Sequence, residues 1–187
     1  MKVLVACEFS GIVRDAFIAR GHDAVSCDII PSEQPGPRIQ DDVLKHLSDG
    51  WDLMIAHPPC TYLAVSGNRW MKDNPQRARM REDALQFVLS LMNAPIEKIC
   101  IENPKSVITS HIRKSDQIIH PWMFGHGEKK ETHLWLKNLP KLVATDVVAG
   151  RAPRVHYMGP GPERAKNRSR TYLGIAIAMA DQWGRMA

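Results

Sequence analysis

Cys60 follows two prolines and an apolar run in the stretch IAHPPCTY, from Ile55 to Tyr62. Consecutive prolines fix two backbone angles and remove two amide donors, so they form a stiff turn that can project the next side chain. A cysteine with a lowered pKa is a strong nucleophile. Cysteine is also among the most commonly buried residues, so taken alone Cys60 is better interpreted as a structural thiol.

Glu102 and Asn103 change this interpretation. They end a second apolar run, EKICIENP, which Pro104 stops. A glutamate at a neighbouring strand end can hydrogen-bond a ring nitrogen and polarise a heterocycle. Together, a thiol nucleophile and an acid that binds the ring are suited to attack on an electron-poor pyrimidine. This favours Cys60 as the nucleophile.

The elements that must position these residues alternate between strand and helix. Apolar runs and helical spacing predict strands at 2–7, 23–29, 52–59 and 97–104, helices at 12–21, 74–94 and 174–186, a proline-rich loop at 31–40 and a late strand and turn at 132–143. This alternation predicts an α/β fold built on a parallel sheet with right-handed crossovers.

The carboxyl ends of these strands carry the polar residues. Ligands of an open parallel sheet bind at those ends, so the topology brings Glu8 to Gly11, Asp28, Cys60 and Glu102 into one neighbourhood. The turn EFSG has a single glycine and lacks the GxGxxG spacing, so a dinucleotide site is not supported. Asp28 could accept hydrogen bonds from a ribose, although a loop acid or helix cap is the commoner role.

Length and cysteine usage bound the class of protein. The chain has 187 residues, enough for one domain with a core, and no apolar run long enough to span a membrane. Its four cysteines are far apart and form no CxxC pair, which favours a reducing, cytoplasmic setting. His57 and Cys60 lack further ligands at standard spacing, so no metal site is predicted. His57 could instead tune the thiol or pack under the turn.

The charge balance favours a polyanionic partner. The net charge is +5 and the pI about 9.1. Basic residues gather in two windows, which hold Arg69, Lys72, Arg77, Arg79 and Arg81, and Arg164, Lys166, Arg168 and Arg170. A solvated helix face is the default for either window, but the loop after Cys60 is the best candidate for phosphate contacts.

HPPC and IENP resemble two motifs of the DNA cytosine-5 methyltransferases, Pro-Pro-Cys and Glu-Asn-Val. In that family the first motif supplies the nucleophile and the second holds the base. The resemblance therefore implies that Cys60 and Glu102 are catalytic and that Asn103 binds the substrate, with Lys130, at a position where the family has an arginine, as a further substrate-binding residue. Arg69 is a substrate-binding candidate because it lies in the basic loop after Cys60.

The resemblance extends, in the right order, to the motifs that bind the cofactor of this family, S-adenosylmethionine. FSG resembles its methionine-binding turn, Asp28 matches the acid on its ribose, and Asp42, in DDV, matches the acid on its adenine. LGIAIAMADQW resembles the final motif, which returns to the cofactor pocket. The implied cofactor-binding residues are Phe9, Ser10, Gly11, Asp28, Asp42, Pro58 and Gly174.

The resemblance implies a Rossmann-like class I methyltransferase domain over 1–187, with a mostly parallel sheet and helices on both faces. It implies S-adenosylmethionine as cofactor, DNA as partner, no membrane contact, and a cytoplasmic enzyme of a bacterium or phage-infected cell. The expected reaction is methylation of cytosine at carbon 5 through a covalent Cys60 adduct.

Several positions depart from the family pattern. Lys130 and Thr132 stand where the family has arginines, Ile175 replaces an asparagine, and residues 137–163 are too few for a target-recognition domain of usual size. Three alternatives follow: a non-catalytic nucleic-acid-binding module, a modifier of free cytidine nucleotides, or an enzyme whose specificity comes from a protein partner or a second copy. A different enzyme on the same fold, such as an oxidoreductase, is disfavoured by the missing glycine fingerprint.

Overall fold

The computed structural model describes residues 1–70, 74–159, 161 and 163–186, and its centre is a β-sheet. The sheet has the strand order β3-β2-β1-β4-β5-β7-β6. The strands are β1 (Lys2–Ala6), β2 (Asp23–Cys27), β3 (Arg38–Ile39), β4 (Leu53–Ala56), β5 (Lys98–Pro104), β6 (Gln117–Ile119) and β7 (Thr132–Lys137).

Most of the sheet is parallel, as the sequence predicts. β1 pairs in parallel with β2 and β4, and the parallel run continues to β3 on one side and β5 on the other. β7 is antiparallel to both β5 and β6. β6 and β7 can pair in this way because the chain between them makes no helical crossover, which parallel neighbours would need.

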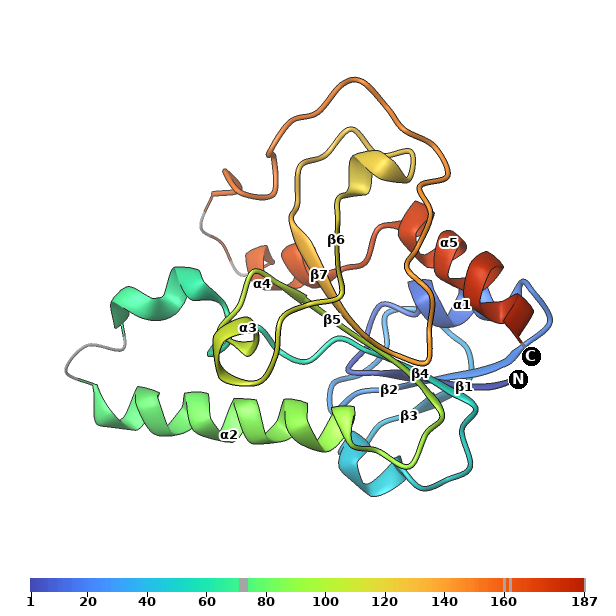
Figure 1. The fold of residues 1–187 in the computed structure, drawn as a ribbon, viewed down its shortest axis with the longest axis horizontal. Coiled ribbons are helices and arrows are strands. Elements are labelled where there is room, and N and C mark those ends of the chain that lie inside the picture. Colours follow the sequence, from blue (N-terminus) through green and yellow to red (C-terminus); the bar gives the residue numbers. More distant parts are fainter. Residues whose placement is uncertain (71–73, 160, 162, 187) are drawn as a thin grey trace.

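Helices cover both faces of the sheet (Figure 1). α1 (Ile12–Ile18) and α5 (Leu173–Trp183) pack on one face, and α2 (Pro75–Met92), α3 (Ile108–His111) and the 3₁₀ helix η1 (Val43–His46) pack on the other. Neighbouring strand residues alternate between these two cores. In β1, Val3 and Val5 join the first core and Leu4 and Ala6 the second, which is why the strand reads as continuously apolar.

The long helix α2 starts where its sequence signals place it. Asn74 caps it by accepting a hydrogen bond from the Arg77 amide, and Pro75 occupies the first turn. Its buried residues are Leu85, Val88 and Leu91, all in the second half of the helix. The first half therefore extends beyond the sheet on the side that carries Cys60.

The sequence did not predict the short elements. β3 lies inside the stretch expected to be a proline-rich loop, and β6, α3 and α4 (Arg164–Ser169) were not foreseen. The 3₁₀ helices η2 (Val65–Trp70) and η3 (Pro121–Met123) were missed as well, whereas η4 (Gly184–Met186) lies within the helix expected at 174–186. Elements of two to six residues are too short for a period to emerge in the sequence.

The region expected to replace a target-recognition domain, 137–163, begins at the last residue of β7, and its other described residues form no helix or strand. They pass over η3 and the segment before β7 (Figure 1), where isolated bridges join Phe124 to Asp146 and Glu128 to Ala152. None of the described helices is long and apolar enough to cross a membrane.

Candidate functional site

A groove of about 950 Å³ opens at the carboxyl ends of β1, β4 and β5. It lies at the place where the strand order reverses, because the chain leaves β1 towards β2 and leaves β4 towards β5 on the opposite side. Such a switch point is where open α/β sheets bind their ligands. Its walls include Cys7 to Ser10, His57 to Thr61, Glu102 to Lys105, and side chains from η2, α2 and α4.

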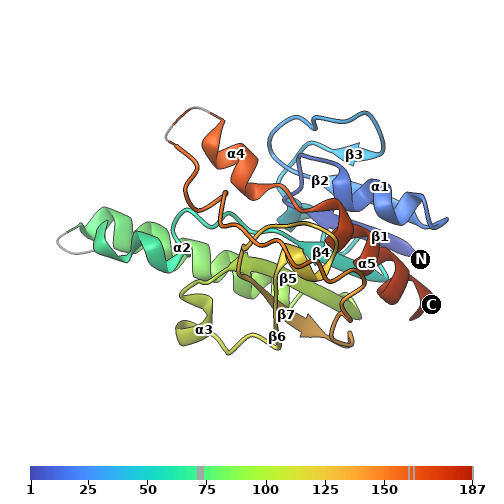
Figure 2. The same ribbon diagram turned by 90° about the horizontal axis from the view of Figure 1, so that it is seen from above.

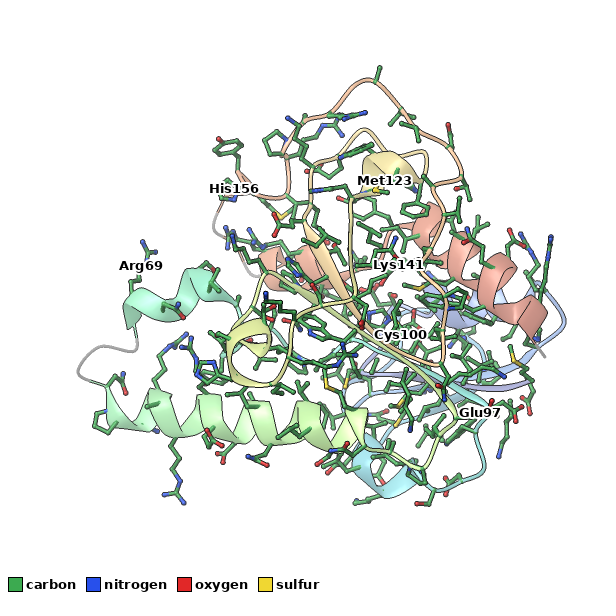
Figure 3. The ribbon with its side chains drawn as sticks, viewed as in Figure 1. Arg69, Glu97, Cys100, Met123, Lys141 and His156 are labelled. Atoms are coloured by element: carbon green, nitrogen blue, oxygen red, sulfur yellow. The ribbon has the colours of Figure 1, made fainter. Side chains whose placement is uncertain are left out.

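Cys60 lies on a turn that starts directly after β4. The His57 amide still donates to the Ala6 carbonyl at 2.9 Å, so the strand pairing continues to that residue. The Cys60 carbonyl accepts from the Ala64 amide at 2.8 Å, which closes the turn after it. Cys60 is the exposed member of the four cysteines, while Cys100 is buried in the middle of β5 (Figure 3). The turn thus projects its thiol into the groove, as the two prolines predict.

The pKa of the Cys60 thiol is raised above its ordinary value. Desolvation of the thiol in the groove is the first cause, although the residue as a whole is exposed, and the charge of Glu102 raises the pKa further. The positive charges of Lys130 and Arg168 lower it, but without reversing the shift. A ligand that neutralises Glu102 would therefore favour the thiolate.

Glu102 is bound by His57. The Nδ1 atom of His57 lies 2.7 Å from Oε2 of Glu102, and both side chains are about nine-tenths buried. Burial by itself raises the pKa of Glu102, but the hydrogen bond and charge of His57, with the charge of Lys130, outweigh it and lower the pKa. Glu102 is therefore ionised at neutral pH.

Asn103 joins β5 to the turn that carries Cys60. Its Nδ2 donates to the Pro58 carbonyl at 2.8 Å, and the residue is 1% exposed. Its Oδ1 is buried without a hydrogen-bond partner among the described residues, although Asn103 lines the groove. An unpaired amide oxygen at this position can accept from a polar ligand.

Glu8 caps the first helix from inside the site. Its Oε1 accepts from the Val13 amide at 2.7 Å and its Oε2 from the Arg14 amide at 3.3 Å. Burial raises the pKa of Glu8, against the opposing effect of His57 and of these two amides. A carboxylate therefore already occupies the place that a cofactor phosphate takes at the first helix of dinucleotide-binding folds.

The turn before α1 is held by unusual backbone angles. Cys7 has a φ of 57°, and Gly11 has a φ of 74°. A Cβ on Gly11 would lie 2.5 Å from Nη2 of the buried Arg14, so glycine is needed for space as well as for conformation. Phe9 and Ser10, between them, line the groove.

Asp28 and Asp42 lie beside this turn rather than on the groove wall. Both carboxylates raise the pKa of Cys7, after the larger effect of its burial, which places them near the end of β1. Each accepts a backbone amide two residues on, from Ile30 and Leu44 respectively. Both thus fill the local capping role of a loop acid.

Gly174 is set apart from the groove lining. Its amide donates to Nε2 of His126 at 2.9 Å, and a Cβ there would lie 1.9 Å from the carbonyl oxygen of Phe124. The close approach of α5 to the segment before β7 is therefore sufficient reason for this glycine.

Basic side chains face the groove from both walls. Arg69 stands on η2 and His156 on the facing segment (Figure 3), and Lys130 lies with its Nζ 5.8 Å from the ring centre of Tyr172. The basic residues of the lining are Arg69, Arg77, Lys105, Lys130, Arg164 and Arg168, against the acidic Glu8, Glu102 and Glu131. The groove therefore has an excess of positive charge.

The basic windows also include residues that serve the fold. Arg81 donates to the Tyr62 carbonyl and to Asn68, which braces the turn after Cys60. Arg170 and Lys166 both bind Glu33, which joins α4 to the connection between β2 and β3 (Figure 2). Lys72, in the first window, lies outside the described residues.

Sequence reasoning missed the partnerships of His57 and Glu8. His57 was expected, at most, to tune the thiol or to pack under the turn, and the structure joins it to Glu102 instead. Glu8 was placed in the neighbourhood without a role. The one signal in the sequence was the position of Glu8, an acidic residue five and six positions before the helix amides of Val13 and Arg14 that it accepts from.

Comparison with known proteins adds a weak structural likeness. No protein-family model matches the chain, and no curated protein matches it. Among solved structures, it is similar to the crystal structure of a candidate DNA modification methyltransferase encoded within an E. coli prophage, at 14% identity with a TM-score of 0.40. The match covers 72% of this chain and 45% of that chain, so the present chain spans less than half of its neighbour's length. A likeness at this level carries no functional assignment.

Proposed function

We propose that the chain is an S-adenosylmethionine-dependent methyltransferase that methylates cytosine at carbon 5 in DNA through a covalent adduct with Cys60. The observation that carries the proposal is the meeting of Cys60 and Glu102 on one groove, with Asn103 bonded to the Pro-Pro-Cys turn. These are the three positions at which the sequence resembles the substrate-handling motifs of the cytosine-5 methyltransferases.

The proposed chemistry divides between the thiol and the carboxyl. The Sγ atom of Cys60, once deprotonated, attacks carbon 6 of cytosine, and Glu102 passes a proton to ring nitrogen 3 so that carbon 5 becomes nucleophilic. After methyl transfer a base removes the carbon 5 proton, the Sγ–carbon 6 bond breaks and the ring gives back the proton on nitrogen 3. Asn103 holds the turn and offers Oδ1 to the exocyclic amine of the ring.

The groove suits S-adenosylmethionine better than a dinucleotide. The helix end at α1 is already occupied by the carboxylate of Glu8, which repels a pyrophosphate and attracts the cationic sulfonium and amine of S-adenosylmethionine. Phe9, Ser10 and Gly11 with Pro58 would hold its methionine part, and Asp28 and Asp42 its ribose and adenine. The cofactor, when bound, supplies the electrophilic methyl group. Gly174 is not among the described residues that line the groove, and its inclusion rests on the resemblance alone.

The charge of the groove favours nucleic acid as the substrate. Its six basic side chains outnumber its three acidic ones, and Arg69, Arg164 and Arg168 stand on the walls around Cys60. A cytosine in duplex DNA must leave the base stack to reach such a pocket, while basic walls contact the flanking phosphates. DNA binding should therefore weaken steeply with added salt.

Methyl transfer to defined substrates tests this function. Tritium-labelled S-adenosylmethionine is incubated with the protein and with double-stranded DNA, single-stranded DNA, RNA or free deoxycytidine monophosphate. We expect label in DNA, recovered as 5-methylcytosine by nucleoside mass spectrometry. Label in the free nucleotide alone would support the modifier of cytidine nucleotides. No label in any substrate, with the cofactor bound, would support the non-catalytic module.

Two cysteine variants provide the matched control. Cys60→Ala should abolish transfer, because it removes the attacking atom. Cys100→Ala removes a buried thiol from the middle of β5 and should leave transfer intact. Equal activity in the two variants contradicts covalent catalysis by Cys60.

A further inference from the structure

His57 is the buried polar side chain of the groove that the proposed reaction leaves without a role. Its Nδ1 lies 2.7 Å from Oε2 of Glu102. Since an ionised carboxylate only accepts hydrogen bonds, Nδ1 is the protonated nitrogen of this pair. Nε2 is buried and has no hydrogen-bond partner among the described residues.

The charge of this ring acts on three carboxylates from three strand ends. Glu8 follows β1, Asp28 follows β2 and Glu102 belongs to β5, and the positive charge of His57 lowers the pKa of each of them against the opposing effect of burial. Lys130 adds a second cation at Glu102. His57 thus influences all three carboxylates, and it is hydrogen-bonded to Glu102.

In the proposed reaction Glu102 delivers a proton to ring nitrogen 3, but Glu102 itself is ionised and must first receive that proton. Thiolate attack brings a negative charge onto the ring, and a proton on ring nitrogen 3 must offset it. Glu102 is ionised at neutral pH, because its neighbours overcome the effect of burial on its pKa. The proton on Nδ1 of His57 is hydrogen-bonded to the Glu102 carboxylate, so it is the proton that can reach Glu102.

We propose that His57 is a positioning residue that holds the Glu102 carboxyl towards the ring and supplies the proton that Glu102 delivers. This inference rests on the proposed function and assigns the proton source for the same site. The proton moves from Nδ1 of the imidazolium to the Glu102 carboxyl and then to ring nitrogen 3, as the bond from Sγ to carbon 6 forms.

The charges balance along this path. The imidazolium becomes neutral, the thiolate becomes a thioether and the ring adduct is neutral. When the thiol is eliminated, the proton on nitrogen 3 returns to Glu102 and then to His57. The carbon 5 proton leaves separately, to the base that the methylation requires. No oxidant or additional reactant is needed.

The test is the pH dependence of kcat in His57→Asn. Asparagine can place its Nδ2 close to the position of Nδ1, so it still donates to Glu102, but it does not titrate. We expect kcat to fall by about 100-fold at neutral pH, the scale of a lost general acid, with KM nearly unchanged. His46→Asn, a surface histidine on η1 beside Asp41 and Asp49, is the control and should behave as the wild type.

The two proteins should also differ in the shape of their profiles. The proposed step uses the thiolate together with the imidazolium, and a rise in pH increases the first form and decreases the second, so the two effects oppose each other in the kcat of the wild type. His57→Asn has no imidazolium to lose, so its kcat should follow the thiolate alone and rise by up to about tenfold per pH unit. A purely structural role would not change this slope.

The outcomes separate the two proposals. Wild-type kcat in His57→Asn, or a wild-type kcat that itself rises tenfold per unit, overturns the role of His57 while leaving methyl transfer standing. No methyl transfer by the wild type overturns the proposed function and this inference together. Calorimetry with S-adenosylmethionine establishes that the variant retains the folded groove. If it does not, the wild-type profile alone decides.

Discussion

Replacing Asn103 tests how the turn that carries Cys60 is held. Asn103→Leu removes the bond from Nδ2 to the Pro58 carbonyl, worth about 1 kcal/mol, and leaves that carbonyl unpaired at a cost of about 1–3 kcal/mol. It also removes the buried, unpaired Oδ1, whose own cost is again about 1–3 kcal/mol. These terms nearly cancel, so we expect a net loss of about 1 kcal/mol of stability.

Asn103→Asp should behave differently because its effect depends on pH. As a neutral acid, its hydroxyl can still donate to the Pro58 carbonyl at 2.8 Å, whereas as an anion it cannot, and it stands beside Glu102. Burial and this bond raise its folded pKa by about 2–3 units above the unfolded value. The neutral form is present in both states below about pH 4, so stability is retained there and is lost as the pH rises through the folded pKa.

The expected loss for Asn103→Asp is therefore about 3–4 kcal/mol at pH 8 and about 1 kcal/mol at pH 5. Urea unfolding of the wild type and both variants at these two pH values measures it. A loss for Asn103→Asp that is the same at both, or a loss above about 3 kcal/mol for Asn103→Leu, would refute the reasoning.

Two further substitutions test the packing of α5 and the electrostatics of the thiol. Gly174→Ala places a Cβ 1.9 Å from the Phe124 carbonyl oxygen, so urea unfolding should show a loss of about 3 kcal/mol in the free energy of unfolding. The control Gly150→Ala, whose Cβ has nothing within 4 Å, should change this free energy little. Equal losses in the two variants would contradict the close approach of α5 to Phe124. Glu102→Gln removes a negative charge that is the second cause, next to burial, of the raised pKa of Cys60. Iodoacetamide should therefore alkylate this thiol faster at neutral pH in the variant. A slower reaction would show that Glu102 does not act on the thiol in this way.

The sequence predicts the central part of the fold because that part depends on local pattern. The apolar runs of β1, β2, β4 and β5 are long enough to show a strand, and each ends at a proline, a turn or an acid. Parallel topology then brings those ends together without further information. Cys60 and Glu102 could therefore be expected on one groove from the sequence alone, and the structure places both there.

The pairings inside the site were beyond that reasoning. His57 and Glu102 are 45 positions apart, and nothing in the periodicity of either strand says which side chain faces which. The basic windows show the same limit. Their composition suggested phosphate contacts, but Arg170 is committed to Glu33 and Arg81 to the turn after Cys60, which depends on tertiary contacts. The short strands β3 and β6 depend on neighbours in the same way.

Trapping the covalent adduct tests the central claim most directly. In DNA that contains 5-fluorocytosine, carbon 5 carries no proton to remove after methyl transfer, so the bond between Sγ and carbon 6 cannot be broken by elimination. Incubation with S-adenosylmethionine, digestion and peptide mass spectrometry should find a methylated fluorocytosine nucleotide on the peptide that contains Cys60, and only when the cofactor is present. Methylation of ordinary DNA without any such adduct, or methylation by Cys60→Ala, would contradict the account.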